Sequence, residues 1–403
     1  EASTCGVSKF PPGHYLCLDG HKESETKYWD LNAVEKSPTT DFNEAVERTE
    51  VLLTDALELR LRSDVPVGCF VSGGVDSSLV SALTAAKLGK TFHAYSIGFD
   101  SASHDESQYV KSLVQRYGIE HHHETLTSEC LEFLPHIVWS YAELFGDSSA
   151  VPTYFVSKNA RRELTVVLTG DGADEAFGGY VDPYAVYLSE WYKRRVPGPL
   201  RAMVRPALKL LGRRGSALRW ANRVEEISRQ SGRANYVDFK RGAWHGTTAS
   251  DSAAQASRGG ITMRHFDQCT SGSEVDRFLY ADLHDRLAYD FLVKVDMATM
   301  AHSLEARSPF LDYRVVEWGY SLSHPTRYKS LRRKAVLKAV AEKYVDPKAV
   351  HRRKMGFTMP QGKWLREPKW QPIVSEIIRR PSVLDEYLPR DAINAVVSRF
   401  NEG

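Results

Sequence analysis

Residues 65–78 read Val-Pro-Val-Gly-Cys-Phe-Val-Ser-Gly-Gly-Val-Asp-Ser-Ser, and this stretch decides the fold. Its first half is apolar and predicts a buried strand, while Ser77 begins an apolar segment with helical spacing. The glycines permit a tight turn, and a helix amino end presents unpaired N–H groups. The stretch therefore predicts an anion cradle made of Ser72, Gly73, Gly74, Asp76, Ser77 and Ser78. It is not GxxxxGK[ST], so a Walker-type NTPase is not expected.

A carboxylate inside such a cradle calls for a cation. Asp76 would repel phosphate oxygens unless a divalent ion came between them, which points to Mg²⁺. A second glycine turn, Gly170-Asp-Gly-Ala-Asp-Glu175, follows another buried strand and carries three carboxylates. We expect Asp174 to be the second magnesium ligand, and Asp171 or Glu175 to face a substrate. An acidic capping loop is the alternative interpretation of this turn.

The strands and helices alternate along the first half of the chain, which predicts an α/β fold with a parallel sheet. Ligands in such sheets bind at the carboxyl ends of the strands, where both glycine turns lie. We expect a hairpin linker at residues 1–40 and an α/β core at residues 41–190. A helical insertion is expected at residues 191–275, with a mobile loop over residues 245–275, and a helical C-terminal part at residues 276–403.

Composition bounds the class of protein. The 403 residues are 42% hydrophobic and 26% charged, with a formal net charge of +2, so a globular chain without a polyanion-binding field is expected. No apolar run reaches the roughly 18 residues of a membrane span, and the start of the chain lacks the pattern of a signal peptide. We therefore expect a cytoplasmic enzyme. Metal ligation by His121-His122-His123 is not favoured, because successive side chains in an extended segment point to opposite faces.

Two later clusters carry further candidate residues. Residues 294–312 interleave apolar positions with Lys294, Asp296, Glu305, Arg307 and Asp312, which fits either a functional cluster or a buried ion-pair network. Residues 351–357 read His-Arg-Arg-Lys-Met-Gly-Phe. A lysine held by such neighbours, here Lys354, can neutralise charge that develops on phosphate.

Taken together, the motifs resemble a known family. SGGVDSS, Ser96-Ile-Gly-Phe-Asp100, TGDGADEAFGGY, SLEARSPFLD and RRKMGF, in this order, resemble the synthetase domain of the glutamine-dependent asparagine synthase family. That family includes β-lactam synthetases and lasso-peptide cyclases. The resemblance implies a pyrophosphatase-loop core of the adenine nucleotide alpha hydrolase type, with ATP and Mg²⁺ as cofactors. It also implies an ATP-dependent carbon–nitrogen ligase that adenylates a carboxylate, releases pyrophosphate and transfers an amine or ammonia to form an amide.

The resemblance also assigns roles residue by residue. The cradle residues match the pyrophosphate loop, and Asp76 and Asp174 match the metal ligands. Nucleotide contacts are implied for Phe70, Ser96, Ile97, Gly98, Thr169 and Gly170. Catalytic roles are implied for Lys354, for Lys329 as the second lysine, and for Asp171, Glu175 and Glu305. Asp171 fills a position that is Glu in asparagine synthetases and Tyr in β-lactam synthetases, so the acceptor amine stays open.

The expected partners follow from the same resemblance. The carboxylate substrate is a small molecule or a peptide, and a homodimer is among the expected assemblies. Family members carry a glutaminase domain before a Pro-Pro-Gly-His hairpin, which here is Pro11–His14. The source of the amine therefore has two alternatives. It comes from glutamine through a glutaminase domain or chain outside this sequence, or it is an amine that does not come from glutamine. The alternatives are an intramolecular amide-forming cyclase and, less favoured, a tRNA-modifying enzyme with the same loop; a nucleic-acid partner is otherwise not expected.

Overall fold

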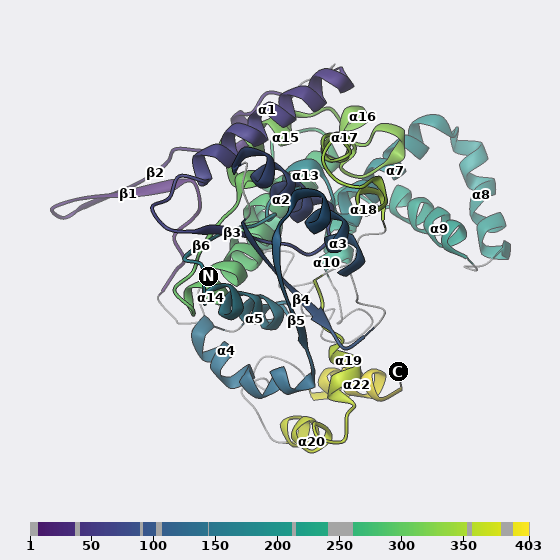
Figure 1. The fold of residues 1–403 in the computed structure, drawn as a ribbon. Helices are drawn as coiled ribbons and strands as arrows, with labels where there is room; N and C mark the ends of the chain where they lie inside the picture. The colour runs from purple at the N-terminus through teal and green to yellow at the C-terminus, as the bar shows by residue number, and fades with distance from the viewer. Residues whose placement is uncertain are drawn as a thin grey trace. The chain divides into compact units, whose positions relative to one another are not determined.

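The parallel sheet predicted from the alternation of strands and helices is present in the computed structural model (Figure 1). The structure describes residues 7–36, 41–88, 92–101, 107–143, 145–211, 215–240, 261–352, 357–379 and 390–402. Five strands pair in the order β5-β4-β3-β6-β7, and every pairing is parallel. They are β3 (Val67–Phe70), β4 (His93–Phe99), β5 (Glu120–Leu126), β6 (Val166–Leu168) and β7 (Glu305–Arg307). The α/β class is confirmed.

The two faces of the sheet bury different side chains, as the period of two in a strand requires. Cys69, Ala94 and Leu168 join the core formed with α1 (Phe42–Arg60) and α2 (Val75–Leu88). Their neighbours Phe70, Tyr95 and Val167 pack on the opposite face against residues of α5 (Ala150–Ala160). Because both faces are covered by helices, a ligand reaches the sheet at the ends of its strands, and the two glycine turns lie at the carboxyl ends.

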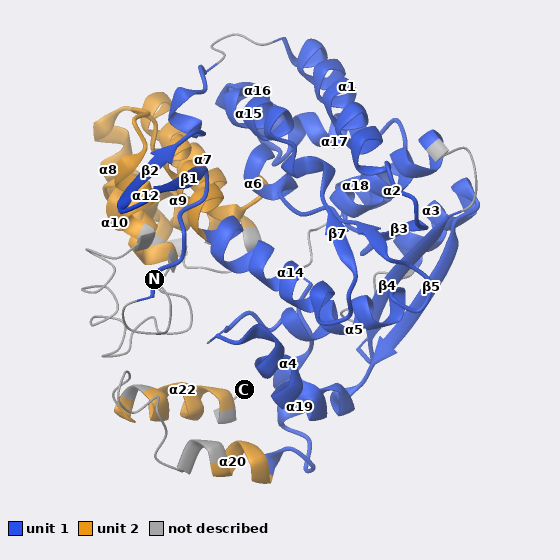
Figure 2. Cartoon of the chain, turned by 90° about the vertical axis from the view of Figure 1, so that its left-hand side faces the viewer, with its two compact units in different colours: residues 1–177, 286–371 blue, residues 178–285, 372–403 orange. Residues whose placement is uncertain are grey.

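The chain divides into two compact units (Figure 2). Residues 1–177 and 286–371 form the unit with the sheet, and residues 178–285 and 372–403 form the second. In the first unit, helices and 3₁₀ turns flank the strands: η1 (Leu31–Ala33), α3 (Ser107–Tyr117), η3 (Ser128–Phe133), α4 (Leu134–Tyr141), α6 (Ala173–Phe177), α14 (Leu292–Met300), η6 (Pro309–Leu311), α15 (Tyr313–Ser321), α16 (His324–Arg327), η7 (Lys329–Leu331), α17 (Ala335–Ala341), α18 (Pro347–His351) and α19 (Gln361–Leu365).

The second unit is helical in the part that the structure describes. Its helices are α7 (Val181–Arg195), α8 (Gly198–Leu211), α9 (Ser216–Arg229), α10 (Gly232–Lys240), α12 (Ile261–Gln268), α13 (Glu274–Ala281), α20 (Gln371–Arg379) and α22 (Arg390–Glu402). The π-helix η5 (Asp282–Phe291) leads back into the first unit. The domain boundaries expected at residues 40, 190 and 275 differ in kind from this division into two units, and they stay a prediction. Among the described helices, none is long and apolar enough to cross a membrane.

Two local expectations are corrected. The predicted mobile loop over residues 245–275 falls partly outside the described residues (245–260), and its remainder contains α12. That helix forms because Met263 and Phe266 are buried, and Phe266 packs on Tyr236 and Phe278. β7 lies within residues 276–403, for which a helical part is predicted. It is a strand of three residues with no apolar alternation to reveal it, and only its pairing with β6 defines it.

The amino-terminal hairpin forms as expected. β1 (His14–Asp19) and β2 (Lys22–Lys27) are antiparallel, and the turn between them places Gly20 at φ +60°. The two residues between the strands are Gly20 and His21, and glycine adopts this positive φ without steric cost.

A buried arginine fixes α6, the short helix that carries the second acidic turn. Arg327 is 1% exposed, and its guanidinium donates hydrogen bonds to the carbonyl oxygens of Ala176, Tyr320 and Leu322. At Gly319 an added Cβ would lie 3.0 Å from the Cβ of Ala176, so α15 and α6 approach closely. The position of the second turn therefore depends on residues about 150 positions farther along the chain.

We expect Arg327→Met to lower the free energy of unfolding by about 3 kcal/mol, because buried carbonyl oxygens would lose their charged donor. Urea unfolding followed by circular dichroism measures the change. Arg116→Met is the matched control, because Arg116 is exposed and its contacts include a long 3.5 Å hydrogen bond to the carbonyl of Lys343 and the ring of Tyr117. Equal stability of the two variants would contradict the role given to Arg327.

Candidate functional site

The first glycine turn closes on itself through its serines. β3 ends at Phe70 and α2 begins at Val75, with Gly73 at φ +66° between them. The backbone N–H of Ser72 donates to Oγ of Ser77 at 3.1 Å, and the hydroxyl oxygens of these two serines also lie 3.1 Å apart. Ser78 is buried, and its backbone N–H donates to the carbonyl of Gly74. The predicted cradle thus stands at the amino end of a helix of 14 residues.

The second turn packs directly against the first. β6 pairs with β3, so the two turns leave adjacent strands at the same edge. A Cβ added to Gly170 would lie 2.9 Å from the backbone nitrogen of Ser77 and 3.1 Å from the Cβ of Asp76. Gly172 has φ +91°, and a Cβ there would lie 2.4 Å from Leu311. Both positions require glycine, and their close packing brings Asp174 toward Asp76.

A single lysine joins the two acidic residues. Nζ of Lys334 lies 2.7 Å from Oδ2 of Asp76 and 2.6 Å from Oδ1 of Asp174. The Lys334 side chain is 5% exposed, and its residue precedes α17 in a left-handed conformation at φ 53°. Burial by itself would lower the pKa of this ammonium, but the charges of Asp174 and Asp76 raise the pKa above its ordinary value. Lys334 is therefore a cation held between two carboxylates.

The donor set suits a hard divalent ion. Asp76 and Asp174 supply carboxylate oxygens, the ligands that Mg²⁺ prefers. Both carboxylates contact the ammonium of Lys334, so the space between them favours a positive charge. The two residues predicted as metal ligands are thus brought together.

The predicted second lysine needs correction. Nζ of Lys329 lies 4.0 Å from the centre of the Phe42 ring, whereas Lys334 contacts both acidic residues of the site. Lys334 directly precedes the buried helix α17, and its side chain is 5% exposed beside the two carboxylates. The sequence signal was the apolar run 335–337 directly after Lys334.

The residues predicted near adenine and ribose lie on β3 and β4. Oγ of Ser96 lies 2.8 Å from a ring nitrogen of His121 and 2.8 Å from one of His123. A Cβ at Gly98 would lie 2.7 Å from His123. Burial, and then the nearby His123, lower the pKa of His121 to about 4, so it is neutral at neutral pH. Phe70 and Ile97 pack on the opposite face.

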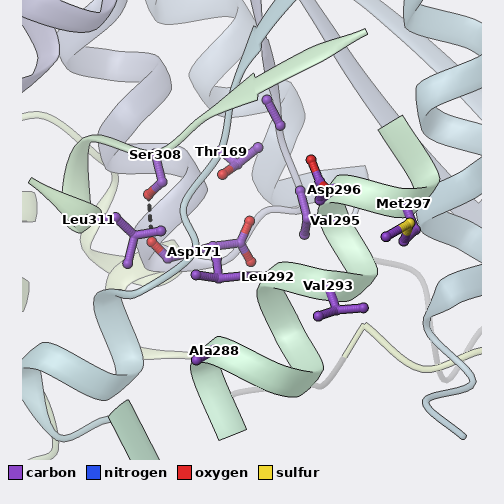
Figure 3. Close-up of a pocket in the computed structure, with 11 residues that line it drawn as sticks. Thr169, Asp171, Ala288, Leu292, Val293, Val295, Asp296, Met297, Ser308 and Leu311 are labelled. Carbon is purple, nitrogen blue, oxygen red and sulfur yellow. Dashed lines mark hydrogen bonds between the residues drawn. The ribbon is translucent and has the colours of Figure 1, made fainter. Parts of the chain in front are cut away.

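A cavity of about 410 Å³ opens beside the second turn (Figure 3). One wall holds Thr169, Asp171, Ala306, Ser308 and Leu311, and the other holds Ala288, Leu292, Val293, Val295, Asp296 and Met297. Ser308 donates a hydrogen bond of 2.5 Å to the carbonyl of Asp171, which fixes the turn. Burial raises the pKa of the Asp171 carboxyl, against the lowering effect of a hydrogen bond with Thr169.

The remaining predicted residues fall in different places. Glu175 is 2% exposed on α6 and does not line the cavity. Glu305 is corrected: it is exposed and pairs with Arg307, and its register partner is Val166, at the opposite end of β6 from Thr169. Lys354 lies outside the described residues. Arg352, which was not singled out, donates from Nε to the carbonyl of Gly73 at 2.9 Å, so the basic segment does reach the cradle.

Comparison with known proteins agrees with the motifs. The asparagine synthase family model matches residues 48–402. The chain belongs to the asparagine synthase family. It is 31% identical to "Asparagine synthetase [glutamine-hydrolyzing] 1" of Bacillus subtilis over 96% of this chain and 60% of that protein. It is 31% identical to a putative asparagine synthetase of Mycobacterium tuberculosis over 82% of this chain and 51% of that one. The chain thus spans about half to three fifths of these curated relatives.

More distant similarities exist within and beyond the asparagine synthase family. "Amidase chry2" of Gibberella zeae is 25% identical over 94% of this chain and 62% of its own length. Among solved structures, NMN synthetase from Francisella tularensis is 19% identical, covering 35% of this chain and 60% of that one, with a TM-score of 0.25.

Lys334→Met should make the protein more responsive to Mg²⁺. Without the ammonium, two neighbouring carboxylates repel each other, and a divalent ion added to them relieves that repulsion. We expect Mg²⁺ to raise the Tm of this variant by more than it raises the Tm of the unchanged protein, by differential scanning fluorimetry. Lys329→Met, the control, should respond like the unchanged protein. Equal responses of all three would contradict the shared charge site.

Asp171→Asn should stabilise the fold in a pH-dependent way. A carboxyl whose pKa is raised on folding contributes stability below its unfolded pKa, and that stability is lost as the pH rises through the folded pKa. The amide does not ionise, so the gain in Tm of the variant should grow as the pH rises above the ordinary pKa of an aspartate carboxyl, about 3.9. A gain that shrinks with rising pH would show that Asp171 is not desolvated.

Proposed function

We propose that this chain is the synthetase part of an ATP-dependent amide-forming ligase. It adenylates a carboxylate with release of pyrophosphate, and ammonia or an amine then displaces AMP. The observation that carries the proposal is the convergence of Asp76 and Asp174, from two facing glycine turns, on the ammonium of Lys334 at the amino end of α2. Membership of the asparagine synthase family supports the reaction class.

The glycine turn and α2 supply the anion site. The helix amino end favours negative charge, and the hydroxyls of Ser72 and Ser77 stand in the turn to donate to phosphate oxygens. Arg352 adds a guanidinium at the carbonyl of Gly73. Bound Mg²⁺ would be held by Asp76 and Asp174 and would neutralise charge on the triphosphate. Lys334 is positioned to stabilise the leaving pyrophosphate, which carries more charge than the bound ester.

Cleavage between the α and β phosphorus atoms is the step proposed for this arrangement. The substrate carboxylate attacks the α phosphorus of ATP, forming an acyl adenylate, and pyrophosphate leaves with the bonding electrons. Lys354, by resemblance, would support the acyl-transfer step. Holding the amine beside the acyl adenylate supplies up to roughly 7 to 11 kcal/mol at the ideal limit.

The cavity beside Asp171 is the proposed site for the substrate. It shares Thr169 and Asp171 with the strand end that carries the acidic turn. We propose a small carboxylate such as aspartate, with ammonia as the amine, because the two relatives described above are named asparagine synthetases. Glutamine, acting through a glutaminase domain or chain, is the proposed source of that ammonia. The reaction is assigned to the cytoplasm, where ATP is available.

One feature of the cavity favours a second candidate, an intramolecular cyclase. The described residues that line the cavity include the carboxyls of Asp171 and Asp296 but no Lys, Arg or His. The rest of the wall is mostly apolar. Such a lining suits the amine end of a larger, partly apolar substrate better than the free carboxylates of aspartate. A substrate that carries both groups would close on itself by the same chemistry.

The reaction products test the proposal. With ATP, Mg²⁺, ammonium and aspartate, we expect AMP and pyrophosphate in equal amounts, measured by nucleotide chromatography and a coupled pyrophosphate assay. ADP and orthophosphate would overturn the mechanism. AMP formation only with an amine-bearing substrate, and without ammonium, would select the cyclase. A requirement for tRNA, weakened by salt, would select the tRNA-modifying alternative.

Asp174→Asn should lower the rate of AMP formation by at least about 100-fold, because the amide keeps the shape of the side chain but removes its charge. Asp64→Ala is the matched control, since Asp64 is exposed and precedes β3 at the opposite end of that strand. Circular dichroism checks that both variants fold. Retained activity of Asp174→Asn would contradict the proposed metal-binding role.

A further inference from the structure

A second cluster of metal-ligating side chains lies at the opposite ends of the strands from the glycine turns. His93 and Glu120 begin β4 and β5 and are register partners, while His122 pairs with Tyr95. Glu163 follows α5, on the face where Tyr95 packs. Four residues from three segments therefore face one point: His93, Glu120, His122 and Glu163.

The distances between the ligand atoms fit a tetrahedral ion. Nδ1 of His93 and Nε2 of His122 are 3.0 Å apart. Oε2 of Glu163 lies 3.2 Å from the first nitrogen and 3.4 Å from the second. Ligand atoms about 2.05 Å from a tetrahedral Zn²⁺ stand about 3.3 Å from one another. Three donors thus already have the spacing that the ion would impose.

A fourth donor stands close by. The carboxylate of Glu120 lies 3.8 Å from the same nitrogen of His93 and 3.8 Å from that of His122. A small rotation of this exposed side chain would bring an oxygen to the remaining position. The His93, Glu120 and His122 ligand atoms all lie within 4.8 Å of one another.

Tyr95 holds two of these donors in place. Its ring stacks on His122 with centroids 4.6 Å apart and an interplanar angle of 9°, and its hydroxyl donates to Oε2 of Glu163 at 2.5 Å. Such supporting contacts orient ligands at metal sites.

We propose that His93, His122, Glu163 and Glu120 bind a Zn²⁺ ion that joins β4, the edge strand β5 and the segment after α5. Two imidazole nitrogens and two carboxylates are an N/O donor set typical of zinc. Both ring nitrogens would coordinate the ion in place of the 3.0 Å contact between them. The site is separate from the nucleotide site, because it stands at the amino ends of the strands.

Zinc titration of the untagged, chelator-treated protein in millimolar Mg²⁺ tests this site. We expect one Zn²⁺ per chain by isothermal titration calorimetry and by elemental analysis after gel filtration. His122→Ala should weaken zinc affinity by at least about 10-fold, with loss of the visible absorption of tetrahedral Co²⁺. His14→Ala is the matched control, since His14 faces a single glutamate at 3.8 Å, and it should bind zinc unchanged.

Further measurements keep the test decisive. Zinc should raise the Tm of the unchanged protein but not that of His122→Ala. If His122→Ala does not fold, Glu163→Gln replaces it. Glu163 is exposed and lies outside the strands, so this substitution removes one charged ligand without altering the sheet. Asp174→Asn, at the opposite strand ends, should leave zinc affinity unaltered, which separates this site from the proposed function. No zinc binding by the unchanged protein, or equal zinc affinity of all variants, would contradict the proposal. The four side chains would then be a cluster held together by hydrogen bonds and ion pairs.

Discussion

The contact between the two glycine turns is the constraint on which the site depends. Gly170 leaves no room for a side chain beside Ser77 and Asp76, so β6 and β3 deliver their acidic turns to one place. Two carboxylates so close would repel each other strongly. Lys334 offsets this repulsion, and its own burial is tolerated because it has both partners. Packing and charge therefore support each other at this edge of the sheet.

The rest of the unit with the sheet positions that contact from a distance. Arg327 holds the carboxyl end of α6, the close approach of Gly319 to Ala176 sets its packing, and Ser308 holds the backbone of Asp171. These groups come from the last third of the unit, far along the chain from the turns. Residues 308–327 thus help to build the site, although they supply few of the side chains that would bind a ligand.

Because all strands of the sheet run in the same direction, the proposed nucleotide site and the proposed zinc site lie at opposite ends of the strands. Carboxyl ends of parallel strands meet helix amino ends, and they gather the glycine turns, the serines and the paired aspartates. Amino ends gather the imidazoles and carboxylates around His93 and His122. Alternation within β5 also divides its histidines, because His121 and His123 face Ser96 while His122 faces Tyr95. The three consecutive histidines therefore do not form one site.

Local patterns in the sequence determined the strands around Cys69 and Val167, the two glycine turns and their acidic residues, because each depends on neighbours within a few positions. The same patterns could not choose between Lys329 and Lys334, remove Glu305 from the site, or reveal β7, Arg327 and Glu163. Those assignments depend on contacts between residues more than a hundred positions apart, or on which face of a strand meets which helix. Only the packed chain decides which side chains share a space, since burial and charge act through distance in three dimensions and not along the sequence.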